Sequence, residues 1–353
     1  MLLEGLQLPL TTPFYPDGRL NLPKLEHNAA RYSKTLVTGL VALSDSGEPT
    51  MLSEEETRLT LRSVADATAA EKVLIAGVSR DSVAGTLDLA QAAAEFGYDA
   101  VLVKRPSVFR AGSGNENAKG LLTYFRVVAD RSPLPVVLYS AASIEGGSLP
   151  VEVVIELAGH PQIIGLVDGA GGGKRIEALK EERGKVKREV HVTAVFAAVT
   201  GRMFRDNGAA GRLIAADMLT GGGAALAVAP TKTAAKTRTK VVGFQVLGGD
   251  TTGMLEALRA GAVGAMPAFA ASAPQACYEV LAAWKDGDEG LAQEKQARLQ
   301  SVAEKVEQEL GVAGIKFGCD LNGYFGWRPR LPILPLTGEN QATIKALMQG
   351  MRH

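Results

Sequence analysis

Eight short apolar runs, spread over most of the chain, constrain its fold more than any other feature. Each run is continuous rather than alternating, as expected for parallel strands buried on both faces. Amphipathic helical stretches separate most of the runs, and eight β–α units in succession favour a closed barrel over an open sheet. The runs occupy residues 6–12, 39–43, 73–78, 100–103, 135–139, 163–167, 244–247 and 262–266. We therefore predict a (β/α)8 TIM barrel over residues 1–275.

Helix-start and helix-stop signals support this alternation. The run Ser53-Glu54-Glu55-Glu56 is a capping box that predicts a helix through Thr68. Ser82 begins another predicted helix, and Gly97 suits the position just after its end. After Ser272 the pattern is helical, with a long helix running through Leu310. Residues 276–353 are therefore predicted to form a C-terminal helical extension packed on the barrel.

A basic insertion at about residues 185–243 interrupts the alternation of strands and helices. It is far longer than a normal connection between two such elements. It holds a strand-like run at 190–199, three glycines at 221–223 and a piece rich in Ala, Thr and Lys. It is either a partly ordered surface excursion, or a lid or subunit contact over the active face. Interleaved aromatic residues, which single-stranded nucleic acids stack on, are absent.

Composition excludes several classes of function. The 38 basic and 38 acidic side chains balance, so no global charge points to nucleic acid or to an anionic membrane. No run of about 18 apolar residues predicts a membrane span, and no signal peptide is visible. Cys277 and Cys319 lack CxxC spacing and are expected to be free thiols in a reducing compartment. A cytoplasmic protein is the simplest prediction.

Several motifs, taken in order, resemble the dihydrodipicolinate synthase / N-acetylneuraminate lyase family over nearly the whole chain outside the insertion. They are Thr12-Pro13-Phe14, Ser46-Gly47-Glu48, Leu138-Tyr139, Gly249-Asp250 and Arg330-Leu331-Pro332. The resemblance implies the barrel fold, a small-molecule ligand at the carboxyl ends of the strands, and a homo-oligomer, either a dimer or a tetramer. No cofactor is expected.

The sixth run departs from that family at the position that carries its chemistry. The family's sixth strand reads Ile-Gly-(Ile/Leu)-Lys-(Asp/Glu), and its lysine forms a Schiff base with a 2-oxo acid. Here the run is Ile164-Gly165-Leu166-Val167-Asp168. Valine has no amine, so we predict that the Schiff-base chemistry is absent or relocated.

The resemblance also assigns roles around this position. Tyr139 corresponds to a proton-relay tyrosine, and Asp45 and Ser46 stand where the family has paired threonines. Turn amides around Ser46 and Gly47 are suited to hold an anion, and Asp168 is a further expected ligand contact. A ligand carboxylate about 4 Å from Asp45 would be repelled by about 4 kcal/mol at an effective dielectric near 20. Asp45 is therefore turned away, or neutral, or the ligand is not a carboxylate bound in the family's manner.

Lys104 is the main candidate for a relocated amine, because it ends the fourth strand on the same face of the barrel. Lys174 and Lys316 are weaker candidates, expected on helices outside the mouth. Ile144 stands near the place of the arginine with which the synthase branch grips a second carboxylate. The run from Arg105 to Val108 replaces a tyrosine pair of the family. Diaminopimelate-pathway synthase activity is therefore not predicted.

Two other kinds of site compete with these. The glycine-rich start of a predicted helix at 168–174 offers amides for an anion, although it lacks the spacing of a P-loop. Strand-end carboxylates at Asp45, Asp168 and Asp250 are oxygen ligands of the kind that magnesium prefers. The sequence thus leaves two principal predictions: a barrel that binds a small oxygenated metabolite without catalysis, and an aldolase-type lyase that uses Lys104 or a metal. A purely structural or regulatory role is the third.

Overall fold

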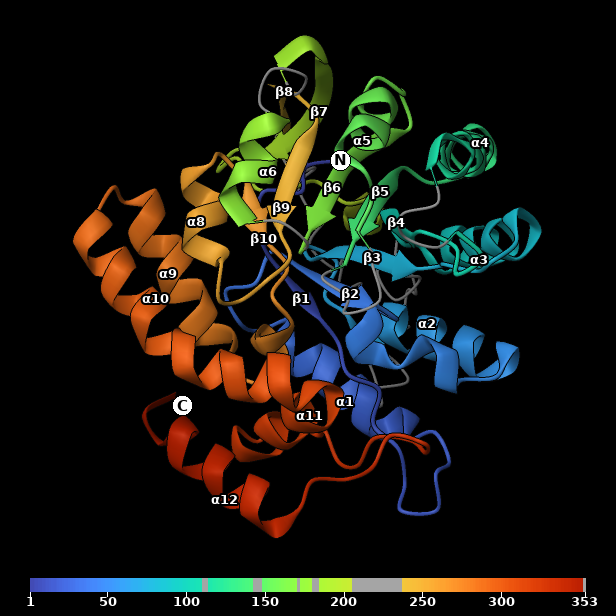
Figure 1. Ribbon diagram of the computed structural model, residues 1–353. Coiled ribbons are helices and arrows are strands. Elements are labelled where there is room, and N and C mark those ends of the chain that lie inside the picture. Colours follow the sequence, from blue (N-terminus) through green and yellow to red (C-terminus); the bar gives the residue numbers. More distant parts are fainter. Residues whose placement is uncertain (110–113, 142–147, 170–171, 180–183, 205–236, 352–353) are drawn as a thin grey trace, which may run out of the picture.

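Eight parallel strands close into a barrel in the order β1-β10-β9-β6-β5-β4-β3-β2 (Figure 1). The computed structural model describes residues 1–109, 114–141, 148–169, 172–179, 184–204 and 237–351. The barrel strands are β1 (Gly5–Pro9), β2 (Gly39–Ala42), β3 (Val73–Gly77), β4 (Ala100–Lys104), β5 (Val136–Ser140), β6 (Ile163–Asp168), β9 (Gln245–Gly248) and β10 (Gly264–Ala265). Every predicted apolar run overlaps one of these strands, so the (β/α)8 barrel is confirmed.

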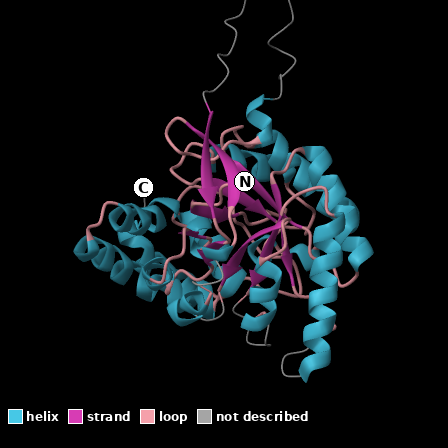
Figure 2. Ribbon diagram, turned by 90° about the horizontal axis from the view of Figure 1, so that it is seen from above, coloured by secondary structure: helices cyan, strands magenta, loops and turns pink. Residues whose placement is uncertain are grey.

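Helices surround the strands on the outside (Figure 2). Those between the strands are α1 (Leu22–Tyr32), α2 (Glu54–Ala67), α3 (Val83–Phe96), α4 (Gly114–Arg131), α5 (Val151–Ala158), α6 (Gly172–Ala178) and α8 (Met254–Arg259). Helix α9 (Pro274–Lys285) contacts β1 and α8, and so takes the eighth helical place. The division predicted at residues 275 and 276 therefore falls at the start of this helix. No described helix is long and apolar enough to cross a membrane.

The C-terminal extension beyond α9 is helical, as predicted. It consists of α10 (Glu289–Ala303), α11 (Gly311–Leu321) and α12 (Gly338–Leu347). The predicted long helix through Leu310 is α10 continued by a π-helical turn, Glu304–Glu309. Cys277 and Cys319 are both buried free thiols.

The capping box at the start of α2 is present as predicted. Ser53 Oγ accepts the Glu56 backbone N–H at 3.1 Å, and the Ser53 N–H donates to Glu56 Oε2 at 3.0 Å. Ser53→Ala removes one of these two bonds and is expected to lower the free energy of unfolding by about 1 kcal/mol. Chemical denaturation of the variant and the wild type measures this difference, and an unchanged midpoint would contradict it.

The basic insertion does not cover the active face in its described part. Its strands β7 (Arg188–Thr193) and β8 (Thr237–Val242) form an antiparallel hairpin. The Arg188 guanidinium donates to backbone carbonyls before and at the start of β6, including that of Ile163 at 2.9 Å. Val190 and Val192 bury their side chains against Leu2, which precedes β1. Since these contacts lie at the amino ends of the barrel strands, the described residues of the insertion do not form the lid that the sequence left as one alternative. The glycines at 221–223 lie outside them.

Candidate functional site

The interior of the barrel is apolar up to a row of three side chains on β4, β5 and β6. Leu102, Val137 and Val167 belong to one buried cluster that fills the barrel. Lys104 and Tyr139 come two residues after Leu102 and Val137, so they point to the same interior side. Lys104 pairs with Tyr139 across β4 and β5, and Tyr139 pairs with Val167 across β5 and β6. The row Lys104–Tyr139–Val167 therefore forms the rim of the interior at the carboxyl end.

Val167 lies inside the barrel, where its side chain is fully buried. Tyr139 is its neighbour on one side, and Leu247 of β9 is its neighbour on the other. Tyr139 presents an aromatic surface to Val167 and Leu247 presents an aliphatic one. The whole cluster around Val167 is hydrophobic. An aliphatic side chain thus occupies this point of β6.

Lys104 and Asp45 form an ion pair across the mouth. Lys104 Nζ lies 2.7 Å from Asp45 Oδ1, and the two side chains are 36% and 46% exposed. Asp45 belongs to a short 3-10 turn, Asp45–Gly47, that follows β2. The turn therefore aims the Asp45 carboxylate over β4, and the ammonium group offsets its charge. The sequence left three alternatives for Asp45: a side chain turned away, a neutral carboxyl, or a ligand that is not a carboxylate bound in the family's manner. The ion pair with Lys104 is a fourth arrangement.

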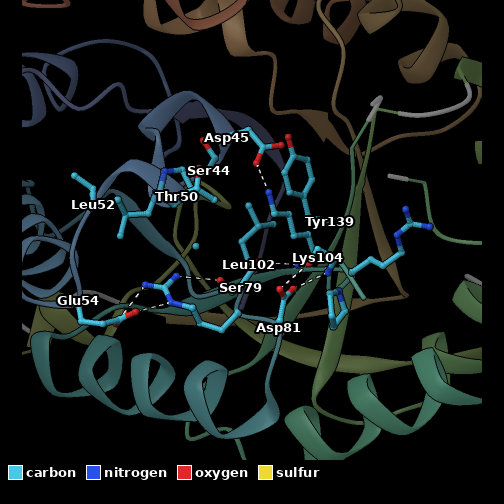
Figure 3. Close-up of a pocket in the computed structure, with 17 residues that line it drawn as sticks. Ser44, Asp45, Thr50, Leu52, Glu54, Ser79, Asp81, Leu102, Lys104 and Tyr139 are labelled. Carbon is cyan, nitrogen blue, oxygen red and sulfur yellow. Dashed lines mark hydrogen bonds and ion pairs between the residues drawn. The ribbon is translucent and has the colours of Figure 1, made fainter. Parts of the chain in front are cut away.

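The Tyr139 phenol lies beside this pair (Figure 3). Burial raises the pKa of Tyr139 well above its ordinary value, and the Asp45 carboxylate raises it further. The phenol therefore keeps its proton at neutral pH, with the Asp45 carboxylate as a hydrogen-bonding neighbour. This is consistent with a proton-carrying role for Tyr139, which stays a prediction.

A cavity of about 410 Å³ opens at the carboxyl ends of β2 to β5. Its volume is within the range of small-molecule sites, roughly 300–1,000 Å³. The Lys104–Asp45 pair and the Tyr139 ring form one side of it (Figure 3). The other lining residues come from the ends of β3 and β4, the start of α2 and the loops after β2, β3 and β4: Leu43, Ser44, Pro49, Thr50, Leu52, Glu54, Gly77, Ser79, Arg80, Asp81, Leu102, Arg105, Pro106 and Ser107.

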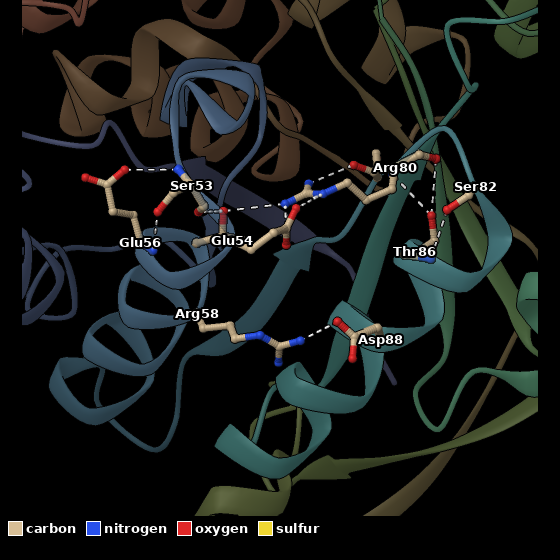
Figure 4. A network of polar contacts seen from close by, with 11 residues as sticks. Ser53, Glu54, Glu56, Arg58, Arg80, Ser82, Thr86 and Asp88 are labelled. Carbon is tan, nitrogen blue, oxygen red and sulfur yellow. Dashed lines mark hydrogen bonds and ion pairs between the residues drawn. The ribbon is translucent and has the colours of Figure 1, made fainter.

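The outer wall of the cavity is held by its own polar contacts (Figure 4). Arg80 donates to both Glu54 carboxylate oxygens, at 3.0 and 3.3 Å. Asp81 accepts the Ser107 hydroxyl and its backbone N–H, each at 2.6 Å. These bonds join the loop after β3 to the start of α2 and to the loop after β4, and so fix this wall of the cavity.

The structure brings only some of the predicted ligand contacts to this cavity. Ser46 and Gly47 are buried in the turn behind Asp45 and do not line it. The Gly47 carbonyl accepts the Thr12 hydroxyl at 2.7 Å, and the Gly47 N–H donates to the Ser44 carbonyl at 2.8 Å. The Gly47 amide is therefore used within the turn rather than offered to an anion.

Asp168 also lies away from the cavity, because it follows Val167 and so points to the outside of the barrel. Its buried carboxylate forms an ion pair with Arg175 Nε at 2.8 Å. Arg175 in turn donates to Ser140 Oγ and to the Leu149 carbonyl. This network holds α6 against β6. In this geometry Asp168 has a structural role in place of the predicted ligand contact.

The described residues give little support to the competing sites. Asp250 accepts the backbone N–H groups of Thr252 and Gly253 at the start of α8. Within the described ranges no group of three or more His, Cys, Asp or Glu side chains is arranged to hold a metal ion. At the glycine-rich helix start, the Gly173 N–H already donates to Glu256 at 3.0 Å. Residues 170 and 171 of that segment, and Ile144, lie outside the described part of the chain.

The sequence did not predict the contacts of two carboxyl groups near the active face, the buried Glu48 and the half-buried Glu307. Glu48 forms a fully buried ion pair with Lys316, which the sequence placed outside the mouth. Glu307 lies against the loops after β9 and β10. Local sequence spacing predicts none of these contacts. Glu48 and Lys316 are 268 residues apart, and Glu307 is 56 residues from Thr251 and 38 residues from Phe269.

Comparison with known proteins agrees with this architecture. The model of the dihydrodipicolinate synthetase family matches residues 2–188 and 223–351, and the gap falls in the insertion. The 4-hydroxy-tetrahydrodipicolinate synthase of Methanothrix thermoacetophila is 25% identical over 99% of this chain and 97% of its own length. The L-threo-3-deoxy-hexylosonate aldolase of Hypocrea jecorina is 26% identical over 99% and 95%.

Solved structures give the same result for the fold. A dihydrodipicolinate synthase from Bacillus anthracis superposes with a TM-score of 0.77 at 21% identity, covering both chains completely. YagE, a prophage protein of E. coli K12 solved in complex with pyruvate, gives a TM-score of 0.74 at 24% identity over 99% of each chain. Since the family model covers most of the sequence and the barrel matches throughout, this chain belongs to the dihydrodipicolinate synthetase family.

Proposed function

We propose that this protein binds a small oxygenated metabolite, of the 2-oxo acid or sugar acid class, at the mouth of the barrel. We further propose that it does so without forming a Schiff base on β6. The row Lys104–Tyr139–Val167 carries this proposal, because it sets a cation and a phenol beside the cavity but an aliphatic side chain on β6. The ligand class is supported by the relatives, among them a hexylosonate aldolase and a structure that holds pyruvate.

The chemistry of the mouth fits an oxygen-rich ligand. The Lys104 ammonium offers donors to a carboxylate, and the protonated Tyr139 hydroxyl offers one to a carbonyl or hydroxyl oxygen. Asp45 does not repel such a ligand outright, since Lys104 lies within 2.7 Å of it. The apolar floor, formed by Leu43 and Leu102, suits a short carbon chain.

Isothermal titration with pyruvate and with a 2-oxo-3-deoxy sugar acid tests this proposal. We expect saturable binding of at least one of the two by the wild type. No heat of binding for either, with folded protein, would overturn it.

Lys104→Gln is expected to weaken the binding of the same ligand by about tenfold or more, because Asp45 would then face the ligand carboxylate without a counter-charge. The double variant Asp45→Asn/Lys104→Gln removes both charges and should recover part of the loss. Equal affinities for the wild type and Lys104→Gln would show that this ion pair does not contact the ligand.

An aldolase-type lyase that uses Lys104 is the second candidate. It is favoured by one observation, that Lys104 shares the interior row with Tyr139. In such an enzyme the Lys104 amine would attack the ligand carbonyl carbon and water would leave, giving an imine. Asp45 disfavours this step, because its carboxylate lies 2.7 Å from Lys104 Nζ and holds that nitrogen in an ion pair. The alternative that uses a metal gains no support from the described carboxylates.

The assembly and the cellular location stay predictions. A homo-oligomer, dimer or tetramer, is expected from the family, and analytical ultracentrifugation of the full chain tests it. A cytoplasmic location is expected from the sequence.

A further inference from the structure

A second cavity lies between the C-terminal extension and the loop after β1. Its volume is about 490 Å³, which is within the range of small-molecule sites. It is lined by that loop, by one face of α11, by the segment that joins α11 to α12 and by the first turns of α12. In Figure 1 the loop is dark blue and the joining segment is red. This cavity and the one at the mouth have no lining residue in common, so they are separate sites.

Two aromatic side chains form a corner of this second cavity. The rings of Tyr15 and Trp327 meet edge to face, with their centroids 6.5 Å apart and their planes at 87°. Both residues are 36% exposed, which is unusual for such large apolar groups. Pro16 and Pro329, next to them in sequence, also line the cavity. The corner therefore suits a flat ring, because aromatic rings favour offset-stacked and edge-to-face contacts.

The backbone holds Trp327 at this corner in an uncommon conformation. Its φ is 58°, in the left-handed region, which is costly for a bulky side chain. Asp320, in the last turn of α11, stabilises this conformation with its carboxylate. Asp320 Oδ1 accepts the Gly326 N–H at 2.9 Å and the Trp327 N–H at 3.2 Å. The direction of the indole is therefore set by contacts within the chain.

Two opposite charges line the same cavity without neutralising each other. They are the Arg328 guanidinium and the Asp320 carboxylate, and neither forms an ion pair with any charged group in the described part of the chain. Lys316, whose charge acts on Asp320, forms its own ion pair with Glu48. A cation and an anion presented together in this way complement a ligand that carries both charges.

We propose that this second cavity binds a free α-amino acid with an aromatic side chain. Its carboxylate pairs with the Arg328 guanidinium, its ammonium group pairs with the Asp320 carboxylate, and its ring packs into the corner of Tyr15 and Trp327. Arginine suits the first contact because its planar fork matches the two oxygens of a carboxylate. This site goes beyond the proposed function and does not depend on it.

Three ligands of similar shape separate these contacts. L-phenylalanine carries both charges, 3-phenylpropanoate lacks the ammonium group, and phenethylamine lacks the carboxylate. Arg328→Gln removes the cation of the cavity. Asp320→Asn removes the anion, while the amide oxygen of asparagine still accepts the N–H groups of Gly326 and Trp327. The matched control is Arg62→Gln, which removes a 70% exposed arginine side chain on α2.

Tryptophan fluorescence locates the binding. The chain has two tryptophans, Trp284 and Trp327, and only Trp327 lines the cavity. In a full-length Trp284→Phe protein the signal therefore comes from Trp327 alone.

The test is titration of the three ligands into the full-length protein, followed by heat and by this fluorescence. We expect L-phenylalanine to bind at least tenfold more tightly than either analogue, and to change the emission of Trp327. Arg328→Gln should weaken L-phenylalanine about tenfold and leave phenethylamine unchanged. Asp320→Asn should weaken L-phenylalanine similarly and leave 3-phenylpropanoate unchanged, and Arg62→Gln should alter none of these affinities.

No saturable binding of L-phenylalanine by the folded wild type would overturn the proposal. Equal affinities for the three ligands, or an unchanged affinity in Arg328→Gln, would overturn it as well. Binding that Lys104→Gln abolishes and Arg328→Gln does not would place the amino acid at the mouth and contradict the second site. The titration with pyruvate tests the proposed function separately, so the failure of either is distinguishable from that of the other.

Discussion

Replacing Val167 by lysine is expected to give a protein that pyruvate and borohydride modify covalently, whereas the wild-type chain stays unmodified. Val167 is fully buried among apolar side chains next to Tyr139. A lysine there would be desolvated, which favours the neutral amine, and the neutral amine is the nucleophilic form. Its nitrogen would bond to the carbonyl carbon of pyruvate with loss of water, and hydride from borohydride would fix the imine as a stable secondary amine.

The mass of the intact protein measures this outcome, as one pyruvate-derived addition per chain. Val241→Lys is a matched control, because it adds a lysine at an exposed position of β8, near the amino-terminal face. That lysine is solvated and protonated, so no addition is expected. A folded Val167→Lys protein that resists trapping would contradict the view that position 167 faces the ligand.

Breaking the Glu48–Lys316 ion pair is expected to have the largest effect on stability. Both side chains are fully buried, and Lys316 Nζ also donates to the Arg328 carbonyl at 3.0 Å and lies 4.5 Å from the centre of the Phe14 ring. Lys316→Met leaves the Glu48 carboxylate buried without its counter-charge, although the Arg330 backbone N–H still donates to it at 2.8 Å. Removing one partner of such a pair costs about 3–5 kcal/mol.

Equilibrium denaturation in urea measures this loss of unfolding free energy. The double variant Glu48→Gln/Lys316→Met buries no charge and should lose clearly less than Lys316→Met alone. If the single and double variants were equally destabilised, the loss would come from packing rather than from the uncompensated carboxylate. The pair joins the turn after β2 to α11, so its loss is also expected to loosen the extension.

The sequence was sufficient for the barrel because the signals for its strands are local. Each apolar run predicts its own strand, and the capping box of Ser53 and Glu56 predicts the start of α2. The interior position of Val167 follows from the same alternation that points Asp168 outwards. The outward direction of Asp168 was therefore predictable, and its choice as a ligand contact overlooked the period of the strand.

The contacts that the sequence did not predict are long-range. Nothing local shows that β7 pairs with β8, since the intervening chain runs from residue 194 to residue 236. The Lys104–Asp45 pair joins the end of β4 to the turn after β2, 59 residues apart in sequence, and it changes how the charge of Asp45 acts. Glu307 was missed for a further reason: the π-helical turn shifts the helical period, so spacing along α10 does not reveal which side chain faces the barrel.

The central claim is that β6 offers no amine to a ligand and that Asp45 holds Lys104 in an ion pair. Peptide mass mapping of the wild-type protein, after incubation with pyruvate and borohydride at neutral pH, tests it most directly. We predict that every lysine, Lys104 included, is recovered without a pyruvate-derived addition, although pyruvate or the sugar acid binds reversibly. A reduced adduct on Lys104, or on any other lysine that reaches the mouth, would contradict this account and establish the lyase in its place.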